Sequence, residues 1–357
     1  MFSTTTKKEY KETLRKLLQI SSPSGREYPM IEYLKEECEK YCAEVYEDPF
    51  GNLVCHYPGQ GKKLMLTAHV DELGFIIKSI SKDGFLHFVP VGGHVQKQLE
   101  ARQVTVNGNI PGVIGAKAGH LTPPEEASKI TPANEMIIDV GATSDAEVRE
   151  MGIGIGSYAS MRDNYMEMQN PDYICARTLD DRAGIAVMLE LMKSLKQEEI
   201  AHDLYLVFTL QEEIGRRGAE AAVNNICPDV AIALDTMPCG DYPGHNWQRD
   251  LPVQLGKGVG CLFTEGRGTM SFMHPKLMQF ILDTAEQNEI AVQLVSVLGI
   301  SCNTDAANMA IAGKGCHAGG LTIPRRYSHS PVELMHMDDA MRMLALVQKL
   351  VVTPYPA

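Results

Sequence analysis

The stretch KLMLTAHVD, residues 63–71, decides the fold. It is an almost continuous apolar run that ends at His69, and a strand of this composition is typically buried on both faces of a sheet. Similar runs follow at 204–210 (LYLVFTL), 230–235 (VAIALD) and 290–297 (IAVQLVSV). Amphipathic helical patterns alternate with them, notably at 180–195 and 337–351. This alternation predicts a doubly wound α/β domain with a mostly parallel sheet.

Residues 74–162 have a different character. Short β-runs such as FIIKSI at 75–80 and FLHFVP at 85–90 flank turn sequences, of which Lys82-Asp83-Gly84 is an example. One helix is predicted within 144–152, with Ser144 and Glu147 as its capping pair. We therefore predict that 74–162 form an inserted β-rich domain that closes like a barrel. The remaining residues, 1–73 and 163–357, then form the α/β domain.

The composition restricts the class of protein. With 33 basic and 45 acidic residues among 357, the net charge is −12, which disfavours polyanions, so we expect no nucleic-acid partner. No apolar run is long enough to cross a bilayer, so we expect no membrane association. The first twenty residues lack the apolar core and cleavage site of a signal peptide, which favours a cytoplasmic protein. Nine scattered cysteines fit reduced thiols better than a disulfide framework.

Side chains that bind metals recur where the predicted strands end. Because the carboxyl ends of parallel strands converge on one crevice, residues far apart in the sequence can meet there. Two more candidates lie at a helix start and in a turn near the C-terminus. The set comprises His69 and Asp71 after the first run, Glu212 and Glu213 after the second, Asp235 at the end of the third, Asp180 in RTLDDRAG, and His329 in RRYSHSPVE.

Two imidazoles and three or more carboxylates offer nitrogen and hard oxygen ligands, a mixture suited to zinc, cobalt or manganese. One ion would leave ligands unused, so we predict two divalent ions, in the first place Zn²⁺ or Co²⁺, with Asp180 bridging them. Two such ions about 3.5–4 Å apart can share a water that loses a proton and attacks a carbonyl. Glu212 is then the general base, and Asp71 accepts the second N–H of His69 and fixes its tautomer.

The order of these motifs resembles that of the tetrahedral, TET-type aminopeptidases, which include glutamyl and deblocking aminopeptidases. The similarity extends from SSPSGRE at 21–27 through DPFGNL, TAHVDELGF, VPVGG, RTLDDRAG, QEEIGRRGA and ALD to PRRYSHSPVE at 324–333. The resemblance implies metal ligation by His69, Asp180, Glu213, Asp235 and His329, with Glu212 as general base and Asp71 orienting His69. It also implies that the β-barrel mediates dimerisation and that dimers assemble into hollow tetrahedral dodecamers whose active sites face the interior.

Two segments depart from the pattern of this family. His94 follows the glycines of VGGH where relatives often carry an aromatic residue, and SCNTDAAN at 301–308 stands where many show a glycine-rich stretch before Thr-Asp-Ala. The ligand positions are untouched. We expect His94 and the segment around Asn303, Thr304 and Asp305 to bear on substrate fit or on assembly contacts.

Two other classes of function stay open from the residues alone. A glycosidase could use Glu212 and Glu213 as acid and base, although such pairs stand about 5–10 Å apart beside aromatic platforms, and the chain has one tryptophan. A non-enzymatic scaffold could hold structural metals, but closed structural sites need no spare carboxylate such as Glu212. The sequence therefore predicts an aminopeptidase that removes N-terminal residues from peptides by a metal-bridging hydroxide. Its preferred residue depends on the shape of a pocket that unaligned loops do not show.

Overall fold

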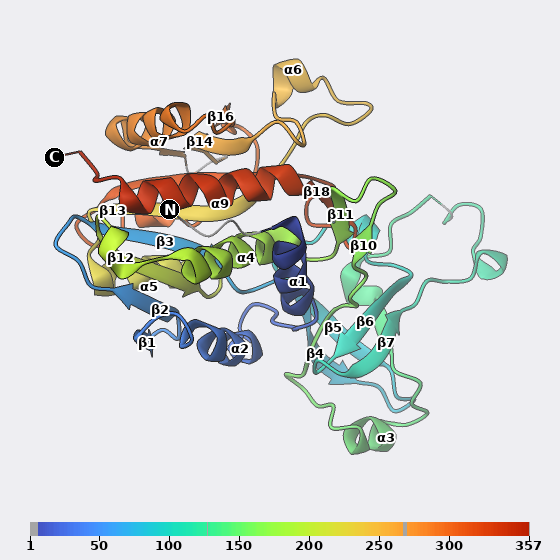
Figure 1. Ribbon diagram of the computed structural model, residues 1–357. Helices are drawn as coiled ribbons and strands as arrows, with labels where there is room; N and C mark the ends of the chain where they lie inside the picture. The colour runs from blue at the N-terminus through green and yellow to red at the C-terminus, as the bar shows by residue number, and fades with distance from the viewer. Residues whose placement is uncertain (1–5, 127, 267–269, 357) are drawn as a thin grey trace.

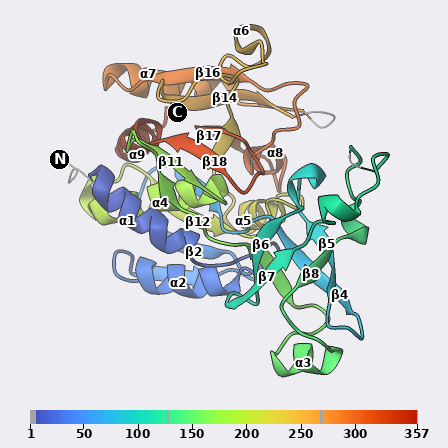
Figure 2. The ribbon, with the colours of Figure 1, turned by 90° about the vertical axis from the view of Figure 1, so that its right-hand side faces the viewer.

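The computed structural model describes residues 6–126, 128–266 and 270–356. It shows an α/β domain with a β-barrel beside it, on the side where β11 (Tyr173–Ala176) and β18 (Glu333–His336) lie (Figures 1 and 2). The first five residues, on which part of the N-terminal interpretation rests, lie outside the described residues. Within the described ranges no helix combines the length and apolar character needed to span a membrane. All nine cysteines are free thiols.

The α/β domain is built on one twelve-stranded sheet whose central strands are parallel. From edge to edge its main path is β1 (Glu44–Glu47), β2 (Leu53–Tyr57), β12 (Asp203–Thr209), β3 (Lys63–His69), β13 (Val230–Pro238), β17 (His317–Arg326), β18, β11 and β10 (Met166–Glu167). Off this path, β14 (Val259–Glu265) pairs with β17, β15 (Ser271–Phe272) and β16 (Val292–Ser296). The four strands β12, β3, β13 and β17 run in the same direction, so their carboxyl ends share one edge.

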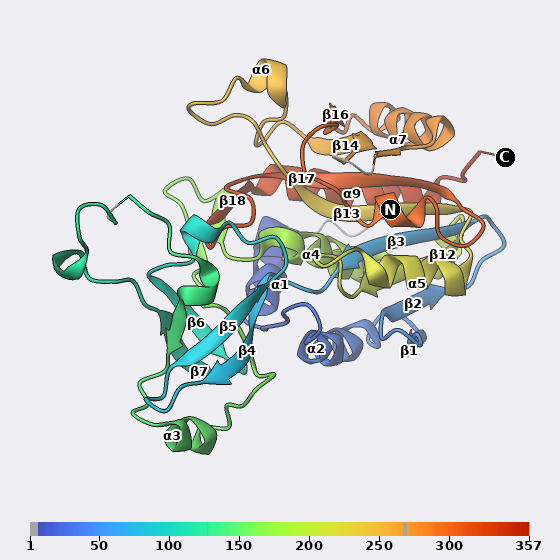
Figure 3. The same cartoon turned by 180° about the vertical axis from the view of Figure 1, so that it is seen from behind.

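Helices cover both faces of this sheet, as Figures 1 and 3 show from opposite sides. One face packs against α1 (Lys7–Leu18), α2 (Tyr28–Cys38), α4 (Leu179–Ser194), α7 (Pro275–Gln287) and α9 (Met337–Val352). The other face packs against α5 (Arg217–Ile226) and α8 (Ala306–Met309), while α6 (Trp247–Asp250) lies in the segment after β13. Along β3, Leu64 and Leu66 belong to the first core and Met65 to the second. This double burial explains why the strand is apolar at nearly every position.

The barrel has six antiparallel strands and a core of its own. Around the barrel these are β4 (Gly74–Ile80), β5 (Leu86–Val91), β8 (Ile137–Asp139), β7 (Ile110–Ile114), β6 (Arg102–Val106) and β9 (Tyr158–Met161). The predicted helix is α3 (Asp145–Glu150), and the Ser144 side chain accepts a hydrogen bond from the Glu147 N–H. The Glu147 carboxylate instead accepts from Thr143, one residue before the cap. The fold class predicted from the sequence, a mostly parallel α/β domain with a barrel-like insert, is confirmed.

Candidate active site

The ends of the parallel strands bring the candidate residues together. His69 ends β3 and is in register with Thr209, the last residue of β12. Asp235 lies in the second half of β13, and His329 lies in the loop between β17 and β18. Asp180 belongs to the first turn of α4, which packs against β3 and β13. Residues more than one hundred positions apart thus form one group, in which His69, Asp180 and Asp235 are buried and His329 is partly exposed.

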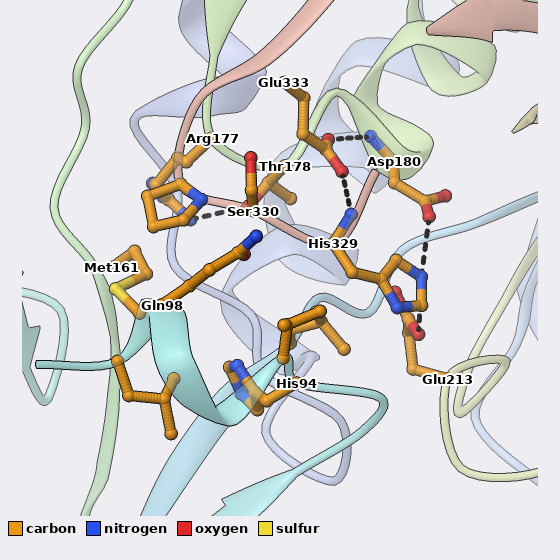
Figure 4. A pocket seen from close by; sticks show the side chains of 14 residues that line it. His94, Gln98, Met161, Arg177, Thr178, Asp180, Glu213, His329, Ser330 and Glu333 are labelled. Carbon is orange, nitrogen blue, oxygen red and sulfur yellow. Dashed lines mark hydrogen bonds and ion pairs between the residues drawn. The ribbon is translucent and has the colours of Figure 1, made fainter. Parts of the chain in front are cut away.

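Asp180 lies between the two histidines. Its Oδ1 is 3.1 Å from Nε2 of His69. Its Oδ2 is 3.4 Å from Nε2 of His329, as Figure 4 shows. Asp235 Oδ1 lies 4.0 Å from the same nitrogen of His69, and Glu213 Oε2 lies 3.7 Å from Nε2 of His329. All five side chains that the sequence analysis proposed as ligands therefore meet, with one oxygen of Asp180 toward each imidazole.

Asp181 is a candidate that the sequence analysis did not assign. The donor atoms of His69, Asp181 and Asp235 lie within 4.8 Å of one another, as do those of His69, Asp180 and Glu213. Asp181 is fully buried; its Oδ1 accepts the N–H of Gly184 at 2.9 Å, and its Oδ2 has no hydrogen-bond partner. The two adjacent aspartates in RTLDDRAG could have pointed to Asp181. Their spacing, however, does not tell which of two neighbouring carboxylates faces the crevice.

Two residues of PRRYSHSPVE hold the candidate ligands in place, although the sequence analysis gave them no role. Glu333 accepts hydrogen bonds from the backbone N–H of Asp180 at 3.2 Å and of His329 at 2.8 Å. The guanidinium of Arg325 contacts both the Glu333 carboxylate and Oδ2 of Asp180. Glu333 thereby ties together two segments that supply ligands, a contact that only the folded chain shows.

Asp71 supports two parts of the site at once. Its carboxylate accepts the backbone N–H of Glu212 at 2.9 Å and of Glu213 at 3.1 Å, and the hydroxyl of Ser24 at 2.6 Å. Nδ1 of His69 lies 3.1 Å from the Asp71 carbonyl oxygen and 3.4 Å from its carboxylate. Asp71 therefore faces His69 and also fixes the turn that presents the two glutamates.

The carboxylates of this group are crowded and desolvated, and burial raises the pKa values of several of them. Burial, with Asp180 and Asp181 adding to it, raises the pKa of Asp235 well above its ordinary value. Burial likewise raises the pKa of Glu212 well above its usual range and that of Glu213 to about 7. Glu213 Oε1 and Asp181 Oδ2 are buried without a hydrogen-bond partner. Crowded, desolvated carboxylates beside two imidazoles fit divalent cations, which would supply the charge and take both kinds of donor.

Two adjoining cavities open onto these residues and share Asp180, Glu213 and His329. The first reaches into the barrel domain, where His94, Gln98 and Met161 line it (Figure 4). The second is lined by residues that include Glu212, Arg216, Asp235, Asn303 and Arg325. His94 also stacks on Phe75 with ring centroids 4.7 Å apart. His94 and Asn303, which depart from the family pattern, thus both lie against the candidate site.

Comparisons with known proteins agree with this chemistry. The model of the M42 glutamyl aminopeptidase family matches residues 51–346. A lysyl aminopeptidase of Pyrococcus furiosus is 34% identical over 345 residues, which are 95% of this chain and 96% of the relative. An aminopeptidase structure from Desulfurococcus kamchatkensis superposes with a TM-score of 0.90 at 35% identity, covering 98% of this chain and 96% of that chain. The Pyrococcus horikoshii TET1 peptidase, reported to assemble into a tetrahedron or a large octahedral shell, has a TM-score of 0.86 at 29% identity, covering 96% of this chain and 99% of that one.

The family match spans most of the chain, from the turn before β2 into α9, and so includes both the strand ends and the barrel. The relatives match over nearly their whole length as well. A match of this extent shows that the chain belongs to the M42 glutamyl aminopeptidase family and is a metallo-aminopeptidase.

Proposed function

We propose that the chain removes N-terminal residues from peptides with two divalent cations held around Asp180 and with Glu212 as general base. The observation that carries this proposal is the position of Asp180, which turns one oxygen toward His69 and the other toward His329. The mixed donor set favours Zn²⁺ or Co²⁺. When bound, such ions polarise the scissile carbonyl and lower the pKa of a water to roughly 7.

The residues divide into two sides. His69 and Asp235, with Asp181 beside them, would hold one cation, while His329 and Glu213 would hold the other. Asp180 is common to both sides. Glu333 accepts hydrogen bonds from the backbone N–H groups of both Asp180 and His329, so it fixes the distance between the two sides.

Glu212 has the position and the environment of a proton carrier. It is 8% exposed, lines the second cavity together with Asp180 and Asp235, and its backbone is fixed by Asp71. Burial raises its pKa well above the usual glutamate range, with the charge of Glu213 adding to the effect. A carboxylate that lies beside the attacking water can take a proton from it and return that proton to the leaving amine. Asp71 positions Glu212 and fixes the orientation of His69.

We further propose that residues 74–162 mediate dimerisation and that dimers assemble into a hollow dodecamer. The closed shells reported for the P. horikoshii relative support this. Val89 on β5 and Val113 on β7 are 47% and 44% exposed, so both side chains are accessible for contact with another copy of the chain.

Release of N-terminal residues from a peptide panel tests the function. The metal-stripped protein is assayed with Zn²⁺, Co²⁺ or Mn²⁺ added back, on peptides with free or acetylated N-termini. We expect trimming of free N-termini only when metal is present. The variant Glu212→Gln should lower kcat by about 10²–10⁴-fold, because a general base contributes that much, while metal content and fold persist. The exposed Glu32→Gln is the matched control.

Each alternative has its own result in the same assay. Turnover by Glu212→Gln at the wild-type rate would contradict the proposed mechanism. Metal-independent cleavage of a glucan would instead support a glycosidase, and bound metal without any cleavage would support a scaffold. Cleavage of acetylated peptides alone would indicate a deblocking activity.

A further inference from the structure

The candidate site already contains one positive charge that the proposed function does not use. Arg325, on β17, is 3% exposed and lines the second cavity. One guanidinium nitrogen contacts Oδ2 of Asp180, and another contacts the carboxylate of Glu333. Its Nε has no hydrogen-bond partner. A buried guanidinium needs carboxylates to balance its charge, so Arg325 depends on the same oxygen that a cation beside His329 would use.

The two oxygens of Asp180 therefore have different surroundings. Oδ1 faces Nε2 of His69, whereas Oδ2 faces His329 and is held by the guanidinium of Arg325. Among the described residues, His69 belongs to both groups whose donor atoms lie within 4.8 Å of one another, one with Asp181 and Asp235 and one with Asp180 and Glu213. The His329 side differs because the Arg325 guanidinium already contacts Oδ2 of Asp180 there.

This asymmetry acts on any divalent cation. A cation on the His329 side would share Oδ2 of Asp180 with the guanidinium and would be repelled by its charge. A cation on the His69 side would lie among the carboxylates of Asp181 and Asp235, which would attract it. Charges buried a few ångströms apart interact strongly, and a difference of about 1.4 kcal/mol already corresponds to a tenfold change in affinity.

We infer that Arg325 makes the two cation positions unequal: it weakens binding on the His329–Glu213 side and leaves the His69–Asp235 side tight. The inference rests on the proposed two-cation site. It follows that the first ion stays bound at concentrations of free metal at which the second exchanges. Hydrolysis then responds to the concentration of free metal through the weaker position.

Calorimetric titration of the metal-stripped protein with Zn²⁺ tests this inference without an activity readout. The wild type should show two classes of site whose dissociation constants differ by at least about tenfold. Arg325→Met should tighten the weaker class by at least about tenfold and leave the tight class unchanged. Arg325→Lys keeps the positive charge, so the two dissociation constants should still differ as they do in the wild type. Arg326→Met is the matched control, because the neighbouring arginine pairs with Asp241 instead of Asp180.

The visible absorption of Co²⁺ provides a second readout, since a site filled later appears as a separate spectral step. If Arg325→Met does not fold by circular dichroism, Arg325→Gln takes its place. Equal affinities of the two sites in the wild type would overturn the inference. So would a ratio of the two dissociation constants that is unchanged in the uncharged variant, Arg325→Met or Arg325→Gln. A wild type that binds one ion beside a neutral variant that binds two would support it.

Failure of the proposed function gives a different pattern. If neither the wild type nor the neutral variant binds two ions, the two-cation site itself is wrong, and the inference falls with it. Two unequal sites in a protein that trims no peptide would contradict the proposed activity and leave the role of Arg325 standing.

Discussion

Among single residues, Glu265 offers a pH-dependent test outside the proposed ligands. It ends β14, is 3% exposed and accepts the backbone N–H of Thr304 at 2.7 Å. Burial raises its pKa from 4.5 to about 7. An acid whose folded-state pKa is raised binds its proton more tightly in the folded state. Its contribution to stability is therefore full below pH 4.5, falls as pH rises through 7, and is then lost.

The variant Glu265→Gln keeps an acceptor for Thr304 but cannot ionise. We expect it to be more stable than the wild type at pH 8 by up to about 3 kcal/mol, and to match it at pH 5 within about 1 kcal/mol. Urea unfolding of both proteins at the two pH values measures the difference. The same substitution at exposed Glu36 should have little effect at either pH. A gain that does not change with pH would contradict this account.

At the residue scale, the sequence indicated the residues at the strand ends, but it did not indicate Arg325 and Glu333, which contact the candidate ligands. His69, Glu213 and Asp235 follow apolar runs, and parallel strands oblige such ends to converge. Arg325 and Glu333 were not assigned, because their function comes from a contact with Asp180 that forms only when α4 docks against the sheet. No periodicity encodes which way a side chain turns after a strand ends.

At the scale of elements, the first turn of α4 depends on a glycine. The carboxylate of Asp181 folds back over Gly184, and a Cβ at that position would lie 2.4 Å from Oδ2 of Asp181. We expect Gly184→Ala to displace this carboxylate and lower Zn²⁺ affinity on the His69 side at least about tenfold, which is about 1.4 kcal/mol of lost coordination. Equilibrium dialysis against a zinc chelator measures the loss.

A control on the same helix separates this local effect from helix stability. Ala186→Gly lies two residues further along α4, where Ala186 belongs to the hydrophobic core. It should cost about 1 kcal/mol of folding free energy, because glycine is a poor helix former, and leave metal content intact. If Gly184→Ala retains wild-type zinc affinity, Asp181 is not part of the site.

The element that the sequence analysis missed is β17. Its residues 317–326 include Gly319, Gly320 and Pro324, which are all poor strand formers. The structure shows how closely both glycines are packed. A Cβ on Gly319 would lie 2.3 Å from the side chain of Met273, and one on Gly320 would lie 3.2 Å from Thr304. Close packing on both faces of the strand overrides its weak propensity, and that packing is invisible before the fold is known.

For the whole molecule, the sequence indicated the inserted barrel by its change from long apolar runs to short β-runs, and the closed six-stranded barrel bears this out. Assembly is different, because it depends on surface residues whose partners belong to other copies of the chain. Exposed valines on β5 and β7 carry no signal in the sequence, where they resemble any alternating strand. Only the resemblance to the TET-type aminopeptidases implied a dodecamer, and the dodecamer remains a proposal for this chain.

The proposed assembly makes a direct prediction about mass. Twelve chains of 39.3 kDa give 12 × 39.3, or about 472 kDa, which sedimentation velocity should detect for the wild type. The double variant Val89→Asp and Val113→Asp places two charges on the exposed barrel surface, where burial against a partner would cost several kcal/mol each. It should sediment as much smaller species. The matched threonine pair, Val89→Thr and Val113→Thr, keeps the shape and adds no charge, so it should stay assembled. If the aspartate pair also remains near the wild-type mass, the barrel surface around these valines is not the dimer interface.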